Sequence, residues 1–235
     1  MEAENWVRWA RTPGHDGYWY YRDFFFEAIV PEPSGLTLEV GCGEGRVARD
    51  LSRYGHRVVA VDSSPTLIRY ARTADPGGAY LLADAARLPF AGGTFDLVVA
   101  YNSLMDVEDM PAAVREAARV LTPEGRLCVC VTHPFTDVGR FASDDGDAPF
   151  VIHGSYLAAR EFHERFERAG LEITFHGYCY PLQDYARALE EAGFVIERLR
   201  EPSVRAEEVE ANRSWIQGRR IPTFLHLRCR KGQGS

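Results

Sequence analysis

Residues 36–62, LTLEVGCGEGRVARDLSRYGHRVVAVD, constrain the fold more than any other stretch of the chain. An apolar run leads into three glycines at alternate positions, Gly41, Gly43 and Gly45, and a helical pattern and a second apolar run follow. Apolar runs of this length predict buried strands. The second run ends at Asp62. A strand, a glycine turn, a helix and a strand with an acid at its tip are typical of open α/β sheets that bind adenosine-containing ligands.

Each of these residue types has a physical reason to stand in such a site. Glycine has no β-carbon, so the turn can adopt positive φ and a ligand can approach its backbone. The helix after the turn offers free N–H groups, and Asp62 can accept two hydrogen bonds from ribose hydroxyls. The pyrophosphate pattern G-x-G-x-x-G/A requires a small residue three positions after Gly43, where this chain has Arg46. The spacing therefore argues against a dinucleotide site.

The pattern that is present is Glu39-x-Gly41-x-Gly43-x-Gly45, followed by Asp62. It resembles the first and second motifs of the class I S-adenosylmethionine (SAM) dependent methyltransferases. The alternative is a glycine turn that only connects a strand to a helix. The resemblance implies S-adenosyl-L-methionine as the cofactor and S-adenosyl-L-homocysteine as its product.

Strand and helix patterns alternate over residues 36–134, which predicts a doubly wound parallel sheet. Residues 223–230 resemble the antiparallel seventh strand of the family. We therefore expect a single α/β domain with a Rossmann-like, seven-stranded, mostly parallel sheet, helices on both faces and an antiparallel last strand. Its expected parts are an aromatic helical lid (1–33), a cofactor-binding core (34–134), an insertion that shapes the acceptor pocket (135–180) and the C-terminal part of the sheet (181–231).

The insertion after the fifth predicted strand is only partly determined by its pattern. Apolar residues alternate over 171–176, which predicts a strand. Residues 160–168 either pair with that strand or form a helix.

The resemblance implies a role for individual residues along the cofactor. Asp84 would accept from the adenine amino group, the Ala85 N–H would donate to the ring, and Leu88 would line the base pocket. The end of the fourth strand, at Tyr101 and Asn102, would hold the methionine part. The full set of expected cofactor contacts is Glu39, Gly41, Gly43, Gly45, Asp62, Ser63, Asp84, Ala85, Leu88, Tyr101 and Asn102.

The N-terminal segment is rich in aromatic residues, and four of them follow one another at positions 18–21. Four consecutive side chains cannot all face one core. The segment is therefore either an amphipathic helix packed on the sheet or a lid over the cofactor and acceptor pocket. In the second case Tyr18 and Tyr21, together with Asp106, are expected to contact the substrate.

Transfer of a methyl group from a sulfonium needs an oriented acceptor, and an oxygen or ammonium acceptor must also lose a proton. His133 is the first candidate for the base, because it follows the fifth strand at the carboxyl edge where ligands bind. The alternative is a structural histidine held before Pro134. His15, His153 and His176 are lesser candidates.

Composition excludes several classes of protein. The net charge of −7 and the pI of about 5.5 disfavour a nucleic-acid groove, and no apolar stretch approaches the length of a membrane span. Five cysteines without metal-ligand spacing suggest free thiols in a reducing compartment. We expect a cytoplasmic monomer or homodimer that binds no nucleic acid, membrane or metal.

The sequence is compatible with three functions. The first is SAM-dependent methylation of a small-molecule acceptor at oxygen or nitrogen. The second is methylation of RNA or protein. The third is a non-catalytic protein that binds an adenosyl ligand or nucleotide, or a reductase with a nucleotide cofactor.

Overall fold

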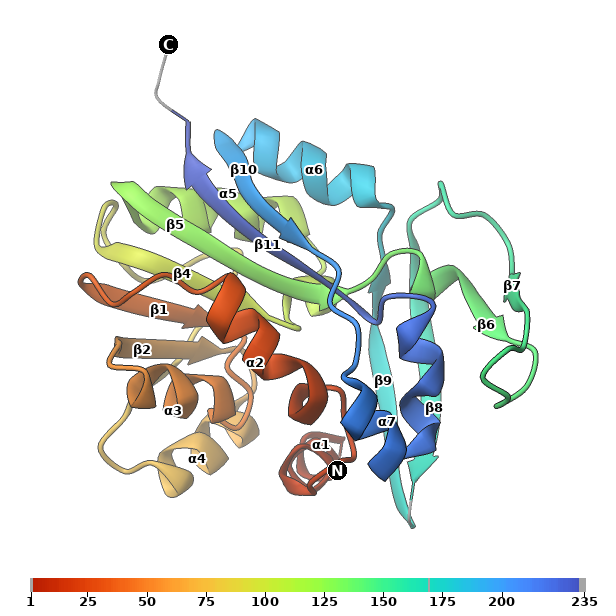
Figure 1. The fold of residues 1–235 in the computed structure, drawn as a ribbon. Helices are drawn as coiled ribbons and strands as arrows, with labels where there is room; N and C mark the ends of the chain where they lie inside the picture. The colour runs from red at the N-terminus through yellow and green to blue at the C-terminus, as the bar shows by residue number, and fades with distance from the viewer. Residues whose placement is uncertain (1, 169, 233–235) are drawn as a thin grey trace.

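The computed structural model describes residues 2–168 and 170–232, which form a twisted sheet covered by helices on both faces (Figure 1). The sheet has seven strands in the order β10-β11-β5-β4-β1-β2-β3. Neighbours from β5 to β3 pair in parallel, whereas β11 is antiparallel to both β5 and β10. The prediction of a mostly parallel sheet with an antiparallel last strand is confirmed. The strands are β1 (Leu36–Val40), β2 (Arg57–Asp62), β3 (Ala79–Leu82), β4 (Phe95–Tyr101), β5 (Leu121–Thr132), β10 (Phe194–Arg200) and β11 (Phe224–Lys231).

Two apolar clusters hold helices on opposite faces of the sheet. On one face, Val114 and Leu189 bring α5 and α6 against strand residues such as Val129. On the other face, Phe25 and Leu51 bring in α2 and α3. The helices are α1 (Glu2–Arg11), α2 (Tyr18–Ala28), α3 (Arg46–Arg53), α4 (Pro65–Ala74), α5 (Met110–Val120), α6 (Leu182–Glu191) and α7 (Ala206–Ala211), with short 3₁₀ turns η1 (Leu104–Asp106), η2 (Thr136–Val138) and η3 (Arg213–Arg219).

Two helices that follow the carboxyl ends of β2 and β4, namely α4 and α5, begin with side-chain caps. The Ser64 Oγ accepts from the Leu67 N–H at 3.3 Å, and Asp109 accepts from the Ala112 N–H at 2.9 Å. A proline occupies the first turn of each helix, where a missing N–H costs nothing. These local signals fix where α4 and α5 start.

The insertion folds into two hairpins, built from β6 (Gly139–Phe141) with β7 (Phe150–Ile152), and from β8 (Arg160–Arg168) with β9 (Leu171–Cys179). Residues 160–168 are therefore a strand and not a helix. The β9 hairpin packs against α1, where Phe175 meets the rings of Trp6 and Trp9 edge-on at 5.9 and 6.1 Å. Figure 1 shows the β8–β9 hairpin beside one end of the sheet, next to α1. The helices within the described ranges are all too short or too polar to cross a bilayer.

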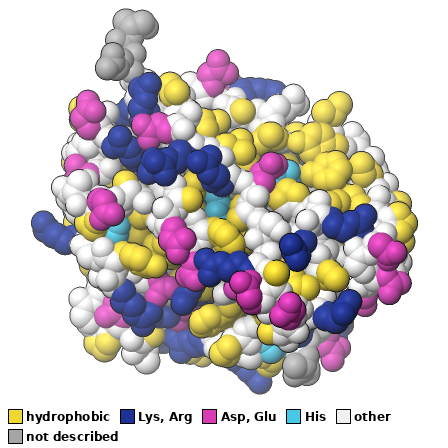
Figure 2. All heavy atoms as spheres, in the orientation of Figure 1, with side chains coloured by type: hydrophobic (Ala, Val, Ile, Leu, Met, Phe, Trp, Pro, Cys, Tyr) yellow, Lys and Arg dark blue, Asp and Glu magenta, His cyan; other side chains and the backbone are white. Residues whose placement is uncertain are grey.

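Basic and acidic side chains are mixed over much of the face in Figure 2, with one group of basic side chains over β10 and β11. Arg126 of β5 and Arg228 of β11 share the Glu197 carboxylate of β10 at 3.1 and 3.4 Å. Arg198 and Arg228 also donate to the carbonyls of Ala28 and Ile29, at the C-terminal end of α2. Cations at this end offset the negative pole of the helix dipole, which gives these two arginines a structural role.

The consecutive aromatic residues at 18–21 pack mainly inward. Tyr18 and Tyr21 are 2% and 0% exposed. The Tyr18 hydroxyl donates to the Asp50 carboxylate of α3, and the Tyr21 hydroxyl lies 3.1 Å from Thr223 Oγ1. Their hydroxyl groups thus fasten α2 to the rest of the domain.

Replacing Tyr18 by Phe removes a donor to a buried carboxylate, although Arg22 and Arg53 still pair with Asp50. A hydrogen bond to a charged group is worth about 1.5–3 kcal/mol, so the free energy of unfolding should fall by about 2 kcal/mol in urea denaturation. The control is Tyr54→Phe, since the Tyr54 side chain is 53% exposed, and it should change stability by less than about 0.5 kcal/mol. Equal stability of the two variants would contradict this assignment.

Candidate functional site

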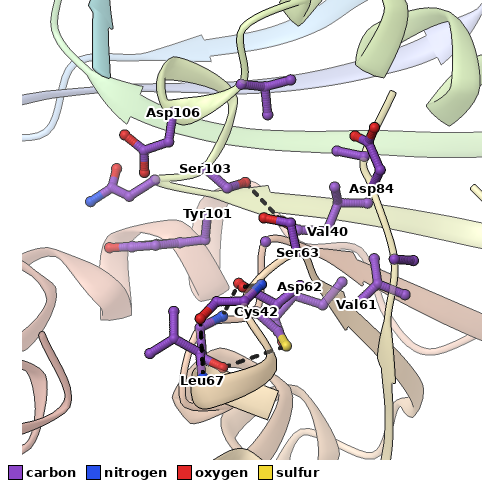
Figure 3. A pocket seen from close by; sticks show the side chains of 18 of the residues that line it. Val40, Cys42, Val61, Asp62, Ser63, Leu67, Asp84, Tyr101, Ser103 and Asp106 are labelled. Carbon is purple, nitrogen blue, oxygen red and sulfur yellow. Dashed lines mark hydrogen bonds between the residues drawn. The ribbon is translucent and has the colours of Figure 1, made fainter. Parts of the chain in front are cut away.

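A cavity of about 680 Å³ opens at the carboxyl ends of β1, β2 and β4 (Figure 3). Strand β1 lies between β2 and β4, so the chain order reverses there, and open α/β sheets bind ligands at this point. The cavity is lined by Trp6 of α1, residues 39–44, 46 and 47 of β1, the glycine turn and α3, the tip of β2 from 61 to 64 with Leu67, the loop from 83 to 86 and the segments 101–103 and 106–109. Gly45, predicted to contact the cofactor, is not in this lining and lies against Tyr80.

The glycine turn forms the floor of the cavity. Gly41 and Gly43 have φ of +72° and +56°, a region that side chains rarely adopt. A β-carbon at Gly41 would stand 2.3 Å from Ser103 Cβ, and one at Gly43 would stand 3.3 Å from the indole nitrogen of Trp6. Glycine is therefore required at Gly41 by both conformation and space, as the sequence pattern predicted.

Asp62 joins the tip of β2 to the glycine turn. Its Oδ2 accepts from the Gly43 N–H and its Oδ1 from the Ser64 N–H, each at 2.8 Å. Burial raises the pKa of the Asp62 carboxyl above its ordinary value, although these two N–H donors act in the opposite direction. Each oxygen retains capacity for a second hydrogen bond, and the residue lines the cavity.

Glu39 lies on β1 beneath the turn and is 1% exposed. The residue lines the cavity, and its buried Oε2 has no hydrogen-bond partner among the described residues. Burial, followed by the charge of Asp62, raises the pKa of Glu39 well above its usual range. A buried polar atom without a partner is costly, so this oxygen is suited to a bound ligand.

The loop after β3 matches the sequence prediction in part. Asp84 and Ala85 line the cavity, and Asp84 Oδ1 accepts from the Ala86 N–H at 2.9 Å. Leu88 does not line it: the side chain is buried in the apolar cluster under α5, and its N–H donates to Glu116. The prediction that Leu88 contacts the base is therefore not supported, because the loop turns this side chain into the core.

The end of β4 contributes Tyr101, Asn102 and Ser103. The Tyr101 hydroxyl is buried and makes no hydrogen bond. The neighbouring Cys130 thiol donates to Asn102 Oδ1 at 3.2 Å. Asn102 has a φ of +49°, the one positive value for a non-glycine residue in the described ranges. Ser103 Oγ donates to the Val40 carbonyl at 2.7 Å, which holds this segment against β1.

Asp106, at the end of η1, is open to the cavity. Within the described chain its carboxylate makes no hydrogen bond or ion pair. The surrounding protein desolvates it, and this effect, with the charge of Asp62, raises its pKa to about 7. A carboxylate with that pKa can exchange a proton near neutral pH.

Tyr18 and Tyr21 do not reach the cavity. Both rings are buried between α2 and the sheet, and their hydroxyls are engaged by Asp50 and Thr223. The predicted contacts of these two tyrosines with substrate are not supported, because the buried face of α2 needs their rings.

His133 is likewise outside the cavity lining. Its Nδ1 accepts from the Phe135 N–H at 3.1 Å, and its Nε2 lies 2.8 Å from Glu201 Oε1. The backbone N–H of His133 donates to the Thr223 carbonyl. This bond places the residue beside the start of β11 and away from β4. Both ring nitrogens are occupied, so the arrangement does not support His133 as a general base.

The lesser histidine candidates are also absent from the cavity lining. His15 lies 3.3 Å from the Arg168 carbonyl, and His176 pairs with Glu2 at 2.8 Å. His153 follows β7 in the insertion and is exposed.

Several residues of the cavity wall were missed by the sequence patterns. Arg46 pairs with Asp16 at 2.6 Å and lies over the rings of Tyr18 and Trp6. Glu44, which is 2% exposed, accepts from Arg11 at 2.9 Å and from Arg49 at 2.8 Å. These ion pairs bind the N-terminal segment onto the glycine turn. The aromatic N-terminus was a usable signal for Trp6, but no local pattern pairs residues so far apart.

Comparison with known proteins gives a consistent result for this region. Residues 38–129 match the family model described as a methyltransferase domain. The chain is 34% identical over 116 residues to a demethylmenaquinone methyltransferase of Beutenbergia cavernae, covering 49% of this chain and 48% of that protein. It is 41% identical over 105 residues to a ubiquinone biosynthesis O-methyltransferase of a Methylobacterium species, covering 42% of each chain. The chain thus spans about half the length of these curated relatives.

A solved structure extends the likeness of the fold to nearly the whole chain. The SAM-dependent methyltransferase from Mesorhizobium loti superposes with a TM-score of 0.74 at 24% identity, covering 92% of this chain and 98% of that one.

The surroundings of His133 determine the direction in which its pKa is shifted. Burial lowers the pKa of the imidazole below its ordinary value of 6.5, and Glu201 opposes this shift. We expect an NMR titration of His133 to show a midpoint below 6.5, and Glu201→Gln to lower it further by removing the opposing charge. Glu207→Gln, on exposed α7, should leave the midpoint unchanged. A midpoint above 6.5 in the parent protein would restore His133 as a candidate base.

Proposed function

This chain belongs to the class I SAM-dependent methyltransferases, and we propose that it transfers the methyl group of SAM to an oxygen or nitrogen of a small-molecule acceptor. One observation carries the proposal. A single cavity at the switch point of the sheet collects the glycine turn, the Asp62 carboxylate, the Asp84–Ala85 segment and the unpaired Asp106. The first three suit an adenosyl ligand, and the fourth lies where an acceptor would meet it.

The cofactor would be held by groups that the protein leaves available. Asp62 has capacity for the ribose hydroxyls, and Asp84 with the Ala85 N–H would bind the adenine edge. The unpartnered Oε2 of Glu39 and the open glycine turn would receive the polar end of the methionine part. When bound, SAM supplies a methyl group that is activated by a sulfonium, whose sulfur keeps the electrons of the broken C–S bond.

The chain itself then has two tasks. It must orient the acceptor, because alignment of the reacting atoms is a large part of the rate. It must also accept a proton when the acceptor carries one. Asp106 is our candidate for the second task, since it lines the cavity, has no partner and has a pKa raised to about 7. Trp6 covers the cavity from α1 and would exclude water.

Size and charge support a small acceptor. A cavity of about 680 Å³ lies in the range of single small-molecule sites, which leaves room for the cofactor and one compact partner. The overall charge of −7 is unfavourable for a nucleic acid. Of the two relatives named above, one is named for demethylmenaquinone and the other for ubiquinone biosynthesis, and both names fit a small acceptor here. All five cysteines are free and buried, which supports our further proposal of a cytoplasmic location.

Calorimetric titration with SAM, S-adenosylhomocysteine and NADH tests the proposed cofactor. We expect micromolar binding of the first two, and a loss of about 10- to 100-fold in Asp62→Ala, because a charge-assisted hydrogen bond is worth about 1.5–3 kcal/mol. Asp144→Ala, an exposed loop position, is the control and should bind normally. Circular dichroism of Asp62→Ala would establish that the domain still folds. Binding of NADH alone would contradict the proposal.

A further inference from the structure

We infer that the acceptor is a positively charged amine, which the Asp106 carboxylate holds at one end of the cavity. This inference rests on the proposed function, because it concerns the second ligand of the same cavity. Its evidence is the distribution of paired and unpaired groups along the cavity wall.

The basic groups of the cavity are already committed. Arg46 is the basic side chain among its described lining residues. It is largely buried, pairs with Asp16 at 2.6 Å and donates to the Ala10 carbonyl at 3.3 Å. An acceptor with a carboxylate or phosphate would thus find no uncommitted cation in this wall, and its desolvation would be uncompensated.

The acidic side chains of the cavity are only partly paired. Glu44 is paired with Arg11 and Arg49, and Asp109 caps α5. Asp106 keeps an unpaired carboxylate that is open to the cavity, and Glu108, an exposed residue, lies two positions further along the same wall. This end of the cavity therefore carries negative charge that the described protein does not neutralise and that a cationic ligand would neutralise.

A second polar group without a partner lies at the same end. The Tyr101 hydroxyl is fully buried and makes no hydrogen bond, and Tyr101 lines the cavity. Figure 3 shows Asp106 and Tyr101 on one side, Asp84 and Val61 on the other, and Asp62 between them. If Asp84 marks the adenine and Asp62 the ribose, the continuation of the ligand leads to Tyr101 and Asp106. The unpaired groups therefore stand where the methyl group would be transferred.

The proton balance of the step is simple. The acceptor ammonium gives one proton to the Asp106 carboxylate, and the freed lone pair forms the new N–C bond while the C–S electrons stay on sulfur. Asp106 then returns the proton to solvent. The groups that face Asp106 are Asp62 from β2, Tyr185 from α6 and the backbone at Gly177 of β9. None of these described groups carries a positive charge, so a cationic ligand beside Asp106 would lower its pKa from about 7.

The test uses the full chain saturated with S-adenosylhomocysteine and two matched pairs of probes. These are 2-phenylethylamine with 2-phenylethanol, and butylamine with butan-1-ol. Calorimetry at about pH 6 in two buffers of different ionisation enthalpy gives both affinity and proton release. We expect each amine to bind about 10-fold or more tightly than its alcohol. Binding should also release roughly half to one proton, because a neighbouring cation lowers the pKa of a carboxyl by about 1–3 units.

Asp106→Asn keeps the size of the side chain and removes its charge. We expect this variant to lose the preference for amines and the proton release, while its affinity for S-adenosylhomocysteine stays within about threefold. The matched control is Asp144→Asn, in the exposed loop between β6 and β7, which should retain the amine preference and the proton release.

Three results would overturn the amine assignment. Equal binding of amine and alcohol is one, an amine preference that survives in Asp106→Asn is another, and failure of both amines to bind at millimolar concentration is the third. Absence of S-adenosylhomocysteine binding in the parent protein would instead overturn the proposed function.

Discussion

The carboxylate of Asp62 is the interaction on which the cavity depends. It accepts one hydrogen bond from the glycine turn after β1 and one from the start of α4, each at 2.8 Å. Parallel pairing brings β1 and β2 together, but it does not determine the shape of the loops beyond their ends. Burial of a carboxylate is unfavourable, and two N–H donors offset much of this cost. The same charge also raises the pKa of Glu39 and of Asp106, so one side chain influences the loop geometry and the proton affinity of the whole site.

The N-terminal segment completes this site through ion pairs that are mostly out of solvent. Glu44, inside the glycine turn, receives Arg11 from α1, and Arg46 reaches back to Asp16. Removal of one partner of such a pair leaves a buried charge without compensation, which is strongly unfavourable. Trp6 is therefore presented to the cavity by a helix whose position is coupled to the turn itself. Of the two alternatives for this segment, α2 is a packed helix that buries Tyr18 and Tyr21, whereas α1 contributes Trp6 to the cavity lining.

Local patterns in the sequence predicted what local forces determine. Apolar runs and glycines identified the strands and the turn, and local caps fix the starts of α4 and α5 in the structure. The same patterns placed His133, Leu88 and Tyr18 near the correct edge of the sheet but could not tell where each side chain points. Direction depends on distant partners: β11 inserts beside β5 and draws His133 toward Thr223, Glu116 binds the Leu88 N–H, and Asp50 receives Tyr18. Pairings over such separations have no local signature.

Four carboxylates of the cavity have different physical explanations. Glu44 is neutralised by two arginines, so protein stability explains its burial. Asp62 accepts hydrogen bonds from two backbone N–H groups, so the geometry of the loops explains its burial. The buried Oε2 of Glu39 has no partner in the described chain and would be more favourable in water or replaced by an apolar group, so a bound ligand explains it better than stability does. The carboxylate of Asp106 also makes no hydrogen bond or ion pair in the described chain, but it is exposed toward the cavity, where it stays available to a ligand. Because Glu39 lies beside the glycine turn and Asp106 beyond it, the arrangement suits one ligand at each end.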